Sequence, residues 1–127
     1  MAFKLTTRSV GEVTVIDLSG RLELGEGSVL LRETLQKSAD GAKILVNLAD
    51  VSFIDTSGIG ELVSGHTRAQ NAGGNLKLTG VPKHVEKLFQ MTGLDRIFDI
   101  YDNDADAIQS WGENVSPTDH LLSQTAV

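Results

Sequence analysis

The sequence contains no cysteine among its 127 residues. Disulfide bonds, thiol catalysis and thiolate metal sites are therefore excluded. It also lacks any apolar run close to the roughly 20 residues that a membrane-spanning helix requires. The first residues carry no apolar segment of the kind found in a secretory signal peptide. We therefore expect a protein of the cytoplasm that has no membrane partner.

Basic residues are fewer than acidic residues in this chain. The chain has 11 lysines and arginines against 17 aspartates and glutamates, which gives a formal net charge of −6 at pH 7. Nucleic acids attract basic surfaces, so this balance disfavours direct binding to nucleic acid. Hydrophobic residues make up 40% of the sequence, and 127 residues are enough for one compact domain with a single core.

Short apolar segments alternate with amphipathic ones along the chain. Strands are expected over 3–9, 12–19, 43–48, about 76–81 and 97–100, and helices after a Ser28 cap, over 58–72, from Pro82 and after an Asp102 or Asn103 cap. Alternation of this kind predicts an α/β fold, with a mixed, largely parallel β-sheet covered by about four α-helices. We expect one domain over 1–111, followed by a flexible C-terminal tail over 112–127, where the periodicity stops.

The stretch FIDTSGIG, residues 53–60, connects a predicted strand to a predicted helix. A helix that begins just after Ser57 presents unpaired N–H groups and the positive end of its dipole at this turn. Ser57 or Thr56 is expected to cap that end. Gly58 and Gly60 lack side-chain bulk, so we expect them to let another molecule approach the backbone closely.

Two catalytic readings of this stretch fail on its neighbouring residues. A phosphate-binding P-loop needs a lysine after its second glycine, whereas Gly60 is followed by Glu61. A serine-hydrolase elbow needs glycines two residues before and after the serine, where this chain has Asp55 and Ile59. We therefore expect no catalytic residues and no enzymatic activity.

Metal ligands are not arranged in a recognisable cluster. No two of the three histidines have a metal-ligand spacing, and His66 lies on an apolar helix stripe, where a core or boundary role is expected. The acidic run 102–106 resembles part of an EF-hand loop, with Glu113 at its twelfth position, but Ala107 replaces the required glycine. Helix capping and solvated charge are the preferred interpretation, with calcium as a minor alternative. We expect no metal and no cofactor.

Two longer segments resemble the STAS domain, in particular the bacterial anti-sigma factor antagonists. They are VNLADVSFIDTSGIGELV, residues 46–63, and GGNLKLTGVPKHVEKLFQMTGLDRIFDIYDNDADAI, residues 73–108. The similarity spans about 3–111. The family signature Asp-Ser/Thr-Ser-Gly-hydrophobic-Gly falls on 55–60 without a gap, and a later Leu-Phe-x-x-x-Gly-Leu element falls on 88–94. The occurrence of both motifs in one chain is specific for this family.

The resemblance implies a partner switch centred on Ser57. In such antagonists, the serine before the first glycine is phosphorylated by a partner that is both a serine kinase and an anti-sigma factor. The unphosphorylated form binds this partner and releases the sigma factor, and a serine phosphatase restores it. Thr56 is a secondary acceptor, and the chain is expected to be a monomer or weak dimer. The partner-binding residues implied are Glu23, Gly25, Asp55, Thr56, Ser57, Gly58, Ile59 and Gly60.

Two departures and two alternatives accompany this hypothesis. Glu23 stands where many relatives have an aspartate, and the segment 24–27 is rich in glycine. A STAS-fold sensor of a small ligand or nucleotide is one alternative, although no cationic phosphate clamp supports it. A non-switching scaffold subunit of a signalling complex is the other.

A phosphate at a helix N-terminus is electrostatically tolerated, so we expect phosphorylation of Ser57 to switch the surface rather than the fold.

Overall fold

The structure is a computed structural model that describes residues 2–38 and 42–112. Its elements are β1 (Lys4–Val10), β2 (Val13–Leu22), α1 (Glu26–Lys37), β3 (Lys43–Ile54), α2 (Thr56–Asn71), β4 (Asn75–Thr79), α3 (Lys83–Thr92), the 3-10 helix η1 (Leu94–Arg96), β5 (Asp99–Tyr101) and α4 (Asp104–Gln109). Their order confirms the predicted succession of strands and helices. The predicted tail lies outside the described residues from position 113 onward, as does the predicted helix end at 40–41.

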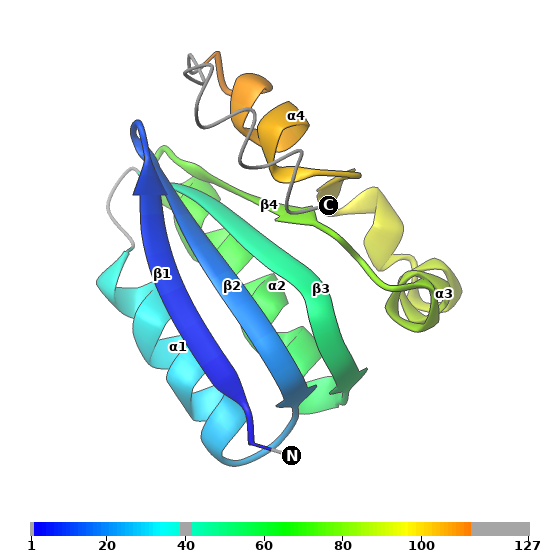
Figure 1. Ribbon diagram of the computed structural model, residues 1–127. Coiled ribbons are helices and arrows are strands. Elements are labelled where there is room, and N and C mark those ends of the chain that lie inside the picture. Colours follow the sequence, from blue (N-terminus) through cyan, green and yellow to red (C-terminus); the bar gives the residue numbers. More distant parts are fainter. Residues whose placement is uncertain (1, 39–41, 113–127) are drawn as a thin grey trace.

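The five strands form one sheet in the order β1-β2-β3-β4-β5 (Figure 1). β1 and β2 are antiparallel, with Lys4 opposite Ser19 and Val10 opposite Val13, whereas the three remaining pairs are parallel. The expectation of a mixed, largely parallel sheet is therefore confirmed. Parallel pairing brings the carboxyl ends of β2 and β3 to the same edge, where Leu22 lies opposite Ile54.

The two faces of the sheet carry apolar clusters of unequal size. α1 and α2 lie together on one face (Figure 1), where the larger cluster joins them and α3 to the strands. Its members include Ile16, Leu18, Ile44, Val46, Leu76 and Leu78 from the sheet and Leu31, Leu35, Leu62, Ala69, Val85 and Phe89 from the helices. The smaller cluster consists of Val13, Val15 and Leu45 with Ala107 and Ile108 of α4. Because successive strand residues point to opposite faces, α4 covers the second face.

Some predicted element ends are wrong. β2 continues past Gly20 to Leu22, and β3 extends to Ile54, because the two strands keep pairing to that point through two register irregularities. α1 begins at Glu26 with Gly25 as its N-cap. Ser28 is therefore a buried residue inside the helix, where its hydroxyl donates to the Gly25 carbonyl at 3.3 Å.

Other local predictions are confirmed, with an exception at Pro82. Gly93 ends α3 in the left-handed conformation, with φ of 79°, and Asn103 caps α4 by accepting a hydrogen bond from the Asp106 N–H at 2.9 Å. His66 is buried, and its ring meets the Phe98 ring edge-on at 5.4 Å between centroids. The predicted place of Pro82 is wrong by one position, because Pro82 is the N-cap of α3 rather than its first residue.

Candidate functional site

The candidate site lies at the sheet edge where β2 and β3 both end. The strand ladder continues one step beyond β3, because the Asp55 N–H donates to the Leu22 carbonyl at 3.2 Å. The loop between β2 and α1 therefore begins beside the turn between β3 and α2. This places Glu23 and Gly25, both expected at a partner surface, on the same edge as residues 55–60.

Asp55 holds these two segments together through its carboxylate. Oδ1 accepts a hydrogen bond from the Gly58 N–H at 2.9 Å, which makes Asp55 the N-cap of α2. Oδ2 accepts from the Leu24 N–H, also at 2.9 Å. The prediction that Ser57 or Thr56 caps the helix is therefore wrong. The helix begins at Thr56, two residues earlier than expected, because an ionised carboxylate is a strong acceptor for the orphan N–H groups.

These hydrogen bonds change the acidity of Asp55. Donation from the backbone N–H of Leu24, and next from that of Gly58, lowers the pKa of Asp55 below its ordinary value of 3.8. The carboxylate is therefore ionised at neutral pH. It then stabilises the fold above the ordinary pKa, and this contribution is lost as the pH falls through the lowered folded pKa.

Replacing Asp55 with asparagine tests this assignment. The substituted amide would retain a neutral capping oxygen, so we expect D55N to fold but to be less stable than the wild type at neutral pH, by about 1 kcal/mol or less. The stability difference should narrow in acid, below pH 3.8, because the wild-type carboxylate then becomes protonated. Urea unfolding of both proteins over a pH series measures it. A difference that stays constant down to the acid limit would show that the charge of Asp55 has no role.

Ser57 and Thr56 occupy the first turn of α2, with Thr56 exposed and Ser57 half-buried. Within the described part of the chain, no side chain forms a hydrogen bond with the Ser57 hydroxyl. Ile59, which is half-buried, donates its N–H to the Asp55 carbonyl at 3.0 Å, the first helical hydrogen bond. The serine hydroxyl is therefore not committed to holding the fold.

The two glycines of the motif have different surroundings. Gly58 is buried, and a Cβ at this position would lie 2.6 Å from the Leu22 carbonyl oxygen and 2.9 Å from Cγ1 of Ile54. Gly58 is thus required by packing of the chain on itself, a reason for the glycine that the sequence did not indicate, whereas its expected contact with a partner stays a prediction. Gly60 is exposed, and a Cβ there would meet no atom of the described residues within 4 Å.

Side chains around the turn form a surface that the sequence motif did not reveal. Leu24 is 77% exposed although its N–H is fixed by Asp55. Arg21 lies over the Phe53 ring, 4.1 Å from its centroid, and its Nε donates to Glu23 Oε2 at 2.8 Å. Glu23 is therefore already in an ion pair within the chain. The strands predicted from apolar alternation end before Arg21 and Phe53. The sequence pattern therefore did not indicate that these two side chains would meet.

A second ion pair joins the two helices that flank this surface. Glu61 of α2 accepts hydrogen bonds from Arg32 of α1, from Nε at 2.9 Å and from Nη2 at 2.7 Å. A hollow beside the β2–α1 loop has a volume of about 180 Å³ and is lined by Ala2, Phe3, Arg21, Glu23, Leu24, Glu26 and Gly27. This hollow is smaller than the roughly 300–1,000 Å³ that is usual for small-ligand pockets.

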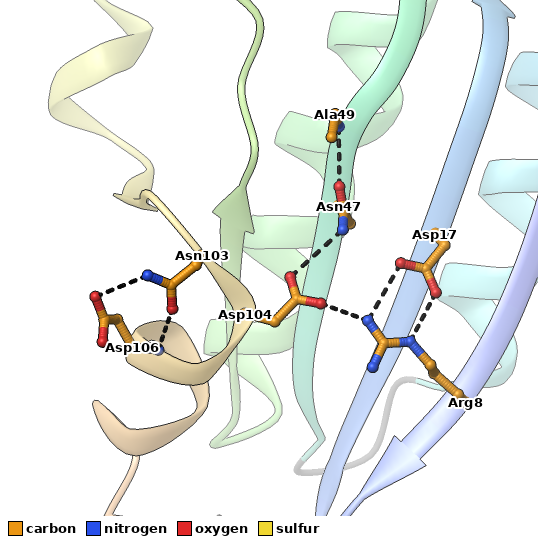
Figure 2. A network of polar contacts seen from close by, with 7 residues as sticks. All are labelled: Arg8, Asp17, Asn47, Ala49, Asn103, Asp104 and Asp106. Carbon is orange, nitrogen blue, oxygen red and sulfur yellow. Dashed lines mark hydrogen bonds and ion pairs between the residues drawn. The ribbon is translucent and has the colours of Figure 1, made fainter. Parts of the chain in front are cut away.

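The acidic run after β5 is engaged in protein contacts. Asp104 accepts hydrogen bonds from Arg8 and Asn47, and Asp106 accepts one from the Asn103 side chain at 3.1 Å (Figure 2). Over residues 2–38 and 42–112, no three acidic or histidine side chains are grouped to hold a metal ion. The helices in these same ranges also include none with the length and apolar character needed to cross a membrane.

The STAS domain family model matches residues 4–107. The chain therefore belongs to the STAS domain family, in agreement with the five-stranded sheet and the Asp55–Gly60 turn described above. This match includes every element up to the middle of α4.

The proteins that this chain resembles include several anti-sigma factor antagonists. The anti-sigma-B factor antagonist of Bacillus subtilis is 31% identical over 85 residues, which cover 67% of this chain and 78% of that protein. The anti-sigma F factor antagonist of Paenibacillus polymyxa is 28% identical over 99 residues, covering 76% and 84%. The structure of the Bacillus cell fate determinant SpoIIAA in its phosphorylated form superposes with a TM-score of 0.65 at 26% identity, covering 86% of this chain and 98% of that one.

Proposed function

We propose that this protein is a cytoplasmic anti-sigma factor antagonist that is controlled by phosphorylation of Ser57. In its unphosphorylated form it binds an anti-sigma factor that is also a serine kinase. Phosphorylation ends this complex, and a serine phosphatase restores it, so the chain acts as a binding module without catalysis of its own. The observation that carries the proposal is the Ser57 hydroxyl, which has no hydrogen-bond partner among the described side chains and lies in the first turn of α2.

The electrostatics of the α2 N-terminus suit a phosphate at this position. A phosphoserine adds about −1.5 to −2 charges at neutral pH. The unpaired N–H groups and the dipole at a helix N-terminus favour such a charge. Asp55 already holds two N–H groups nearby, so the fold does not need the serine hydroxyl. Phosphorylation should therefore change the surface while the domain stays folded.

The partner surface proposed for this switch consists of residues from both loops. Thr56, Ser57, Ile59 and Gly60 contribute from α2, and Glu23, Leu24 and Gly25 contribute from the β2–α1 loop. Leu24 adds a largely exposed apolar side chain to a set whose other large apolar member, Ile59, is half-buried. Asp55 and Gly58 support this surface from within, because one bridges the two segments and the other lets them pack closely.

A kinase assay tests the acceptor. We expect incubation of the purified chain with its anti-sigma factor partner and ATP to add a single phosphate, located on Ser57 by fragment mass spectrometry. Ser57→Ala should remain unmodified, whereas Thr56→Ala, changed at the neighbouring hydroxyl, should be modified normally. Phosphate on Thr56 alone, or undiminished modification of the Ser57→Ala variant, would contradict the proposal.

A further inference from the structure

α4 is a small element on the face of the sheet opposite α1 and α2. It has six residues and buries only Ala105, Ala107 and Ile108. Beneath it lie Val13, Val15 and Leu45, which have at most 1% of their surface exposed. A helix of this length is not stable by itself in water, so its contacts with the sheet must hold it in place.

A polar network attaches the N-terminal end of α4 to three strands (Figure 2). One carboxylate oxygen of Asp104 accepts from Arg8 of β1, and the other accepts from Asn47 of β3 at 3.4 Å. The same arginine donates its Nε to Asp17 of β2 at 2.8 Å. The Asp104 side chain is only 12% exposed, whereas that of Arg8 is 42% exposed. The link between Arg8 and Asp104 is therefore accessible to solvent and salt.

A second cation contacts the C-terminal end of α4. Lys77 of β4 is 6% exposed, and its ammonium group donates to Ser110 Oγ at 2.6 Å. The ammonium lies 4.5 Å from the centre of the Trp111 ring and 5.4 Å from that of Tyr101. Over the described ranges, no carboxylate pairs with Lys77, so the buried charge depends on a hydroxyl and two aromatic faces.

This side of the sheet also contains polar atoms that the closed arrangement does not satisfy. The Thr79 hydroxyl and the Trp111 indole N–H are buried and have no hydrogen-bond partner among residues 2–38 and 42–112. Thr79 follows Lys77 by two residues on β4 and therefore points to the same face. Burying such groups without a partner is unfavourable, and water would satisfy them if α4 moved away.

We propose that α4 together with Ser110 and Trp111 forms a charge-latched lid, which opens as a unit while the rest of the domain stays folded. Arg8 and Lys77 are the two latches, one at each end of the helix. Opening hydrates the unsatisfied Thr79 and Trp111 groups and uncovers Val13, Val15 and Leu45. The lid lies on the opposite face from α2, so it is independent of the role proposed for Ser57.

Salt and one substitution test the lid in the full-length chain. Raising the ionic strength from about 0.01 M to about 1 M shortens the Debye length from roughly 30 Å to 3 Å and should weaken the Arg8 latch. We expect amide hydrogen exchange within α4 to accelerate, and the emission of Trp111, the single tryptophan, to shift to the red. Arg8→Gln should accelerate α4 exchange by about two- to fivefold at low salt and reduce its salt dependence.

The matched control is Arg32→Gln, which removes an arginine–carboxylate pair between α1 and α2 on the other face. It should leave α4 exchange and Trp111 emission unchanged. The amides of α2 and β3 should exchange at wild-type rates in Arg8→Gln. If α4 amides exchange only at the rate of global unfolding, or respond neither to salt nor to Arg8→Gln, the lid does not exist. Amide exchange of the wild type at low and high salt tests whether the lid opens even if Arg8→Gln does not fold.

Discussion

Replacing Ser57 with aspartate is expected to weaken binding to the proposed anti-sigma factor kinase by about a hundredfold or more, whereas Ser57→Ala should bind as the wild type does. Loss of only about 3 kcal/mol of binding free energy suffices for a hundredfold change. The loss should arise at the interface, because an added carboxylate brings bulk, desolvation and repulsion from acids of the partner. Calorimetric or pull-down binding of wild type, Ser57→Ala and Ser57→Asp measures the effect.

The control for this prediction is Thr56→Asp, which places the same charge on the adjacent, exposed residue of the same helical turn. We expect it to reduce binding less than Ser57→Asp does. Circular dichroism and unfolding should show that Ser57→Asp remains folded, because the start of α2 tolerates negative charge. Binding by Ser57→Asp at wild-type strength would refute the switch, and a melted domain would refute a switch confined to the surface.

Gly58→Ala should destabilise the domain by about 2–4 kcal/mol. Its new Cβ would lie 2.6 Å from the Leu22 carbonyl oxygen and 2.8 Å from Cγ of the Leu22 side chain, distances that real Cβ atoms do not show. The first obstacle is backbone and cannot rotate away, so the start of α2 must shift from the ends of β2 and β3. Overpacking of this kind usually costs about 1–3 kcal/mol and occasionally more. Urea unfolding measures the change.

Gly60→Ala is the matched control, since it adds the same methyl group two residues further along the helix. Across the described part of the chain, a Cβ at Gly60 meets no atom within 4 Å, and alanine favours the helix over glycine by up to about 1 kcal/mol. This variant should therefore be as stable as the wild type or more so. Equal stability of the two alanine variants would show that α2 adjusts freely and that Gly58 has no special packing role.

Features with a local cause could be predicted from the sequence. Alternating apolar segments indicated the order of strands and helices, and the glycine at 93 and the asparagine at 103 marked helix ends through their own backbone and side-chain chemistry. The apolar stripe around His66 correctly indicated burial. Each of these signals is contained within a few residues, and the tertiary structure did not override them.

Features that depend on distant residues were not predictable in the same way. Asp55 replaces Ser57 and Thr56 as the cap because its second oxygen has a partner in another loop, the Leu24 N–H. The role of Gly58 depends on how closely Leu22 approaches from β2. Arg8 and Asp104 are separated by 96 residues, so no local pattern could join them. In each case the deciding contact exists only after the strands have paired.

The shared carboxylate of Asp55 has a consequence for the entropy of recognition. Because one side chain accepts hydrogen bonds from both the Leu24 and Gly58 N–H groups, the β2–α1 loop and the start of α2 are restricted from moving independently. A partner that contacts both segments therefore meets a surface that is already ordered, and little conformational freedom remains to be lost on association. Cutting one of these two hydrogen bonds should thus slow or weaken recognition even where no contacting side chain has changed.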